Sequence, residues 1–292
     1  MPRLFEIVQQ TARDVGRDRV LTYAAALAFY TALSLPPLLV ILVWLLGAVS
    51  PGAEGHLEAE AAQLVGQDGA HLVGAILDNA DQRVALGAGV SGWVSAGALL
   101  FAASGVFAQL QKALNRIWGV RAKPGSGVLT WLRKRGLSLG LVGVLAFLAA
   151  VSLFASALLA SVGFGDGEGA LARVVEGVAS IGVFGVLFAA VFKWLPDVQM
   201  AWRDVIGGAL LTAVLFSLSK SLISLYLAQK GLGTAYGAAG SAIVVLAWVY
   251  LSGVVVFVGA EITKAWLATG GRLPEPSAIA EWIPGEGPDE AA

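Results

Sequence analysis

Long apolar segments alternate with short polar ones along this chain, and six of them have the length of a membrane-spanning helix. A hydrocarbon core of about 30 Å requires about 20 apolar residues, and a helix is needed because it satisfies its own backbone hydrogen bonds in lipid. No Asp, Glu, Lys or Arg occurs in the segments 24–49, 84–110, 136–165 and 231–260, and the segment 205–229 contains only Lys220. The shortest, 177–192, reaches the required length when Lys193 and the next two residues are included. We predict spans at 24–49, 86–110, 136–162, 175–195, 205–228 and 239–264.

This pattern predicts an all-α fold, a polytopic membrane protein with six transmembrane helices. A cytoplasmic segment, 1–23, precedes the membrane domain at 24–268. The loop at 51–83 repeats apolar residues at helical spacing, which predicts outer amphipathic helices. The tail at 269–292 is rich in Pro, Gly and acidic residues, so we expect it to be disordered and cytoplasmic.

The distribution of Lys and Arg predicts the orientation of the chain. Of the 19 such residues, 15 fall in segments on one side of the predicted spans and only three on the other. Because cytoplasmic loops carry the excess of Lys and Arg, both termini are expected in the cytoplasm. The composition, 57% hydrophobic and 13% charged, agrees with a multi-pass protein of a bacterial-type plasma (inner) membrane.

The first span contains a kink signal next to polar side chains. Pro36 and Pro37 each remove a backbone donor and clash with the preceding turn, so the helix should bend or open there. Tyr30 and Ser34 lie on one helix face near that point, which makes the four residues candidates for lining a cavity. The alternative is a kink that only shapes the helix bundle.

Lys220 is the only charged residue of the predicted span at 205–228. Ser217, Ser221 and Ser224 lie near it on a stripe of small and polar residues, a face typical of helix contacts or cavities. An inward lysine would need a partner or a water-filled site, so we predict a contact with an anionic group. Snorkelling to the outer interface and a purely structural hydrogen bond are the alternatives.

Glu261 closes the sixth span on the predicted inner side. It lies too deep along its helix to reach Lys220 at 1.5 Å per residue. Its expected neighbours are Asn115, Arg116 and Arg203, which form a candidate inner-side polar cluster. We favour a structural ion pair there over proton or substrate binding.

Enzymatic chemistry has little support in the residues. The chain has no cysteine and two histidines, both in the outer loop, so no metal site is expected. No catalytic triad or phosphate-binding loop is present, and we predict neither an enzyme nor a cofactor. Tryptophans near the predicted interfaces, including Trp118, Trp194 and Trp266, are typical of an aromatic belt.

The expected partners are membrane lipids. The inner loop between the second and third spans holds seven cations and no acid, which favours contact with anionic headgroups and not with nucleic acid. A homo-oligomer is left open.

Three strings of the sequence resemble one known family. AALAFYTALSLPPLLVIL at 25–42, NRIWGV at 115–120 and YGAAGSAIVVLAWVYLSGVVVFVGAEIT at 236–263 occur in the order found in the YihY/virulence factor BrkB family. The resemblance covers about residues 10–268 and implies an inner-membrane protein of six spans. It also implies roles in the cell envelope; the older ribonuclease label of the family finds no supporting chemistry in these residues.

Two functions remain open from the sequence. The first is a transporter or a protein that handles lipids or other amphiphiles, with Lys220 and the kinked first span in contact with the substrate. The second is a non-transporting scaffold or assembly factor of the envelope that uses its loops as docking surfaces. A polar cavity favours the first, and a closely packed bundle favours the second.

Overall fold

The computed structural model describes residues 2–47, 105–123, 170–230 and 240–287, with a few positions between 59 and 75. The chain divides into two compact units. Unit 1 contains Met1–Ala24, Ala108–Ser217 and Val254–Ala292, and unit 2 contains Ala25–Phe107 and Leu218–Gly253.

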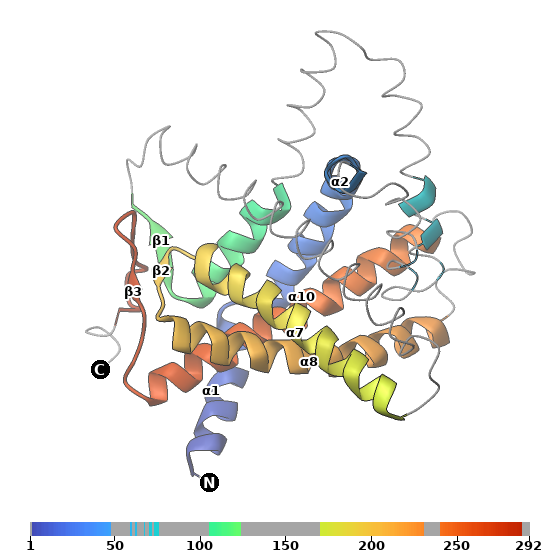
Figure 1. Cartoon of the computed structure of the whole chain (residues 1–292). Helices are drawn as coiled ribbons and strands as arrows, with labels where there is room; N and C mark the ends of the chain where they lie inside the picture. The colour runs from blue at the N-terminus through green and yellow to red at the C-terminus, as the bar shows by residue number, and fades with distance from the viewer. Residues whose placement is uncertain are drawn as a thin grey trace, which may run out of the picture. The chain divides into compact units, whose positions relative to one another are not determined.

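Helices make up most of the described chain, which confirms the predicted helical class (Figure 1). Residues 105–117 are also helical. The long helices are α1 (Pro2–Arg17), α2 (Val20–Gly47), α7 (Ala170–Trp194), α8 (Trp202–Lys230) and α10 (Gly240–Thr269).

Four of these helices coincide with predicted spans, namely α2, α7, α8 and α10. Within the described residues, Trp202–Lys220 and Ala242–Thr269 are long and apolar enough to cross a membrane. The spans predicted at 86–110 and 136–162 lie largely or wholly outside the described residues, as does most of the outer loop. Six crossings therefore stay a prediction.

In unit 1, α8 and α10 pack through two reciprocal glycine–threonine pairs. A Cβ added at Gly208 would lie 2.6 Å from Oγ1 of Thr263, and one added at Gly259 would collide with Thr212. Each threonine is fully buried and donates its hydroxyl proton within its own helix, Thr212 to the carbonyl of Gly208 (2.8 Å) and Thr263 to that of Gly259 (2.7 Å). Small residues let two helix backbones approach closely, which is how helices associate in lipid.

Aromatic side chains join α7 to α8 in the same unit. The ring of Phe216 lies 4.8 Å from Phe184 and 5.5 Å from Phe188, measured between centroids. Such tilted and edge-on contacts are favourable beyond the area that they bury. In unit 2, the buried side chains of Ile223 and Val244 form a small core against Trp248 and its neighbours.

The first predicted span is helical on both sides of its two prolines. The helix α2 is continuous from Val20 to Gly47, so Pro36 and Pro37 do not open it. Figure 1 draws the first part of α2 side-on and its later part end-on, a change of direction along one helix. A bend is what two missing backbone donors within a helix produce.

The C-terminal tail corrects the expectation of disorder. Its strand β4 (Ala280–Trp282) pairs antiparallel with β1 (Val120–Ala122), and β3 (Glu275–Pro276) pairs with β2 (Val198–Gln199). The Pro and Gly content suggested disorder, but proline is tolerated in a short edge strand, where its missing donor need not face a partner. The all-α fold class is therefore incomplete, because two small sheets accompany the helices.

Three exposed tryptophans lie at helix ends in unit 1. Trp194 ends α7, Trp202 begins α8 and Trp266 lies in the last turn of α10, with 50%, 52% and 42% of their surfaces exposed. The amphipathic indole ring favours the level of the lipid headgroups. Trp118 is buried at 3% exposure, so its assignment to the belt was wrong.

Candidate functional site

A buried carboxylate, Asp18, is the centre of an ionic cluster in unit 1. It lies in the two-residue turn between α1 and α2, where Arg19 adopts a left-handed conformation with φ of 55°. Asp18 is fully buried. Its oxygens lie 3.0 Å from Arg116 Nη2, 3.4 Å from Lys264 Nζ and 3.6 Å from Arg17 Nη2. A buried charge is stable when it is paired in this way, so the turn ties three helices together.

Arg17 stays cationic in this cluster. Burial by itself would lower the pKa of its guanidinium, but the carboxylates of Asp18 and Asp14 outweigh that effect and raise the pKa. The Nη2 atom of Arg17 also lies 3.3 Å from Asp14.

Glu261 belongs to the same cluster, and the charged groups that act on it are not the expected arginines. It is fully buried and interacts electrostatically with Lys264 and Asp18. Its carboxylate oxygens make no hydrogen bond of normal geometry with the described residues. Arg116 instead forms ion pairs with Asp18 and Glu286. Its connection to Glu261 is indirect, through Asp18, which interacts with both residues.

The other two members of the predicted cluster have different partners. Asn115 forms a two-point contact with Asp197: its Nδ2 donates to Oδ2 and its Oδ1 accepts from the backbone N–H, both at 2.8 Å. Gln111 adds a 3.3 Å hydrogen bond to the same carboxylate. Arg203 is largely exposed and lies 4.0 Å from Asp204.

Asp197, Asp18 and Lys264 are therefore the residues that sequence reasoning missed. Lys264 follows Glu261 at a spacing of three on one helix, which was a usable signal. Asp18 pairs with Arg116 and Lys264, and Asp197 with Asn115, all of which lie far away in sequence.

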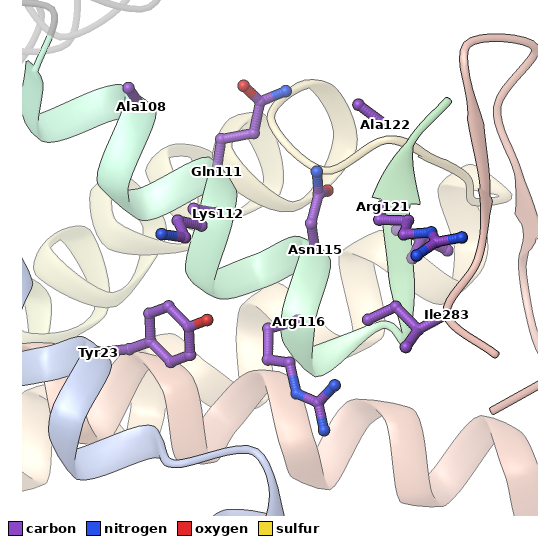
Figure 2. A pocket seen from close by; sticks show the side chains of 10 residues that line it. Tyr23, Ala108, Gln111, Lys112, Asn115, Arg116, Arg121, Ala122 and Ile283 are labelled. Carbon is purple, nitrogen blue, oxygen red and sulfur yellow. The ribbon is translucent and has the colours of Figure 1, made fainter. Parts of the chain in front are cut away.

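A cavity of about 380 Å³ lies next to this cluster in unit 1. Figure 2 shows Lys112, Asn115 and Arg116 on the helix at 105–117, with Tyr23 of α2 and Arg121 of β1 around them. The remaining lining residues are Gln111 and four apolar side chains. Three cations and no acid therefore line the cavity within the described chain.

The lining cations differ in how far they are neutralised. Arg116 lies 3.0 Å from Asp18 and 2.9 Å from Glu286, and Arg121 lies 2.9 Å from Glu281. Lys112 is exposed, and neither its ammonium nor the hydroxyl of Tyr23 has a hydrogen bond or ion pair among the described residues. Among the described residues, the cavity thus offers an unpaired cation and an unpaired hydroxyl beside two arginines that are in ion pairs.

The candidate residues inside the spans are placed only in part. Ser34 is buried and faces Gly105, where an added Cβ would lie 3.5 Å from its Oγ, whereas Tyr30 is 42% exposed. Lys220 is partly buried, and the buried Oγ of Ser217 has no hydrogen bond to the described residues. The side chains of Ser221, Ser224, Pro36 and Pro37 lie outside what the structure describes, so the contact of Lys220 stays a prediction.

Two described helices are long and apolar enough to cross a membrane, and exposed tryptophans lie at helix ends, which are features of helical membrane proteins. The chain belongs to the family described as virulence factor BrkB, whose model matches residues 11–278. This match confirms the resemblance found in the sequence.

Relatives of the chain are membrane proteins by name. It is 29% identical to a UPF0761 membrane protein of Pseudoalteromonas translucida, over 84% of this chain and 81% of the relative. A UPF0761 membrane protein of Methylibium petroleiphilum is 30% identical over 84% of this chain, which spans 58% of that longer relative. One from Vibrio vulnificus is 28% identical over 86% of this chain and 79% of the relative. No solved structure matches the chain.

Proposed function

We propose that this membrane protein handles an anionic amphiphile of the cell envelope, as a transporter or lipid-handling protein, and holds its headgroup in the cationic cavity. The observation that carries the proposal is the lining by Lys112, Arg116 and Arg121 without an acid among the described lining residues. Arginine and lysine are the side chains that bind phosphate oxygens most strongly.

The size and position of the cavity support a headgroup as its occupant. Its volume of about 380 Å³ is at the lower end of the range for small-molecule sites, which suits a headgroup better than a whole lipid. Asn115 of the lining is bonded to Asp197, three residues after the exposed Trp194. The cavity is thereby linked to a helix end whose tryptophan is suited to the headgroup level.

A scaffold without transport is the second candidate. The observation that favours it is the pairing within the ionic cluster, where Asp18 meets three cations and Asp197 meets two side-chain amides. Such pairing holds helices in a fixed arrangement and needs no substrate.

Binding of short-chain lipids to the full-length protein in neutral nanodiscs tests the proposal. We expect dioctanoyl phosphatidylglycerol to bind more tightly than dioctanoyl phosphatidylcholine. Lys112→Gln should weaken binding of the anionic lipid about fivefold, because one cation beside an anionic headgroup contributes about 1 kcal/mol to the binding free energy. Arg13→Gln is the control, since Arg13 is an exposed cation of α1 and lies outside the lining.

Equal affinity for the two lipids would contradict the proposal. A second assay, with fluorescent phosphatidylglycerol in proteoliposomes, distinguishes a transporter from a scaffold. Transport moves labelled lipid from the inner to the outer leaflet, where a membrane-impermeant quencher reaches it. Binding without faster quenching would favour the scaffold.

A further inference from the structure

Two acids that pair with cations of the cavity lining come from one short segment of the C-terminal tail, in addition to Asp18 on Arg116. Glu281 on β4 lies opposite Arg121 on β1, and its Oε1 is 2.9 Å from both Nε and Nη2 of that arginine. Glu286 lies five residues later, with Oε1 2.9 Å from Arg116 Nη2. Ile283, between the two acids, lines the cavity. The segment 281–286 thus neutralises two of the three lining cations.

The backbone fixes these carboxylates in place. The N–H of Ile283 donates to the carbonyl of Gly119 (2.8 Å), and the N–H of Lys123 donates to the carbonyl of Ile279 (3.0 Å). Gly119 has a φ of +67°, and a Cβ there would lie 2.9 Å from Glu286 Oε2. A residue with a side chain at 119 would be strained and would push Glu286 away.

The contact between Glu286 and Arg116 is incompletely satisfied. The second carboxylate oxygen, Oε2, is buried and has no hydrogen-bond partner among the described residues. A buried acceptor without a donor costs free energy. A phosphate group, with more oxygens and a larger charge, is a stronger acceptor for the same guanidinium.

We infer that the C-terminal tail is an intramolecular competitor at this cavity, with Glu281 and Glu286 on the arginines that the phosphate of a bound ligand would engage. The inference rests on the proposed function and adds the ligand class, a phosphate-bearing headgroup or small phosphate compound. A ligand enters at the free ammonium of Lys112, and its phosphate oxygens then replace the carboxylates on Arg116 and Arg121. The tail therefore lowers the affinity of the cavity.

A purely structural role of the two acids predicts the opposite result. If they only hold the tail, their removal lowers stability and leaves affinity unchanged or weaker. If they compete, their removal raises affinity in a protein that remains folded.

Glu281→Gln and Glu286→Gln, singly and together, test the inference in the full chain in neutral nanodiscs. Glu275→Gln is the matched control, because Glu275 lies on the same tail but, unlike Glu281 and Glu286, forms no ion pair with a described lining cation. Affinity is measured for dioctanoyl phosphatidic acid and, separately, for glycerol phosphate. We expect about fivefold tighter binding per substitution, since one unit charge near the site contributes about 1 kcal/mol, and about 25-fold tighter binding for both. The control should bind as the parent does.

Unchanged or weaker affinity in double variants that melt at the parent temperature would overturn the inference. Should the double variant fail to fold, Glu281→Gln decides alone, because its ion pair is exposed. The proposed function itself would instead be overturned if the parent protein bound no lipid and Lys112→Gln had no effect on binding. Tighter binding of the lipid than of glycerol phosphate identifies a headgroup, and equal binding identifies a small phosphate compound.

Discussion

The contact of α8 with α10 and the ionic cluster around Asp18 hold helices of unit 1 together by opposite means. The first brings two backbones together by omitting side chains at Gly208 and Gly259, and each threonine is satisfied within its own helix. The second joins α1, α10 and the helix at 105–117 through one buried carboxylate and three cations. The first contact is therefore fixed by shape, whereas the second depends on buried charges that must all be paired.

The largest expected effect comes from removal of the central carboxylate. Asp18→Ala leaves Arg116, Lys264 and Arg17 without their shared partner, and breaking a buried pair costs about 3–5 kcal/mol. We expect a large fall in the melting temperature, measured in detergent by monitoring unfolding through tryptophan fluorescence. Glu6→Ala on the exposed part of α1 is the control. A melting temperature equal to that of the control would mean that the cluster does not hold these helices.

A smaller effect is expected at the glycine–threonine contact. Gly208→Ala places a methyl group against Thr263, and overpacking of this kind costs about 1–3 kcal/mol. Gly182→Ala is the matched control, because a Cβ at that helical position of α7 meets nothing within 4 Å. Alanine should be neutral or slightly stabilising at 182, given its higher helix propensity. Equal melting temperatures for the two variants would disprove the close packing.

The smallest effect on stability is expected at the rim of the cavity. Arg121→Gln breaks an exposed ion pair, which contributes less than about 1 kcal/mol in most proteins. The melting temperature should change little, while binding of anionic lipid weakens. Strong destabilisation without a change in binding would place Arg121 with the structural cluster and remove it from the site.

Much of the fold could be predicted because long apolar segments have few alternatives in lipid. The helices α2, α7, α8 and α10 coincide with predicted spans for that reason. The tail could not be predicted, since β4 depends on β1, and Arg121 and Glu281 are 160 residues apart. The composition of the tail contains no information about the distant strand with which it pairs.

The polar site was predictable only in its components. Asn115, Arg116 and Glu261 were identified because polar groups at a membrane boundary require partners. Their actual partners could not be chosen from the sequence, because Asp197 lies 82 residues from Asn115 and Asp18 lies 246 residues from Lys264. The cavity itself depends on the folded tail and had no signal in the hydropathy pattern.

The most direct test of the central claim is a cryo-electron microscopy structure of the full chain in nanodiscs that contain phosphatidylglycerol. An antibody fragment would supply the size that a chain of 30.0 kDa lacks. The account predicts density for a headgroup in the cavity, with its phosphate within hydrogen-bond distance of Lys112 and with Glu281 and Glu286 displaced from their arginines. A closed, empty cavity with both carboxylates in place, and lipid phosphate bound at Lys220 instead, would contradict it.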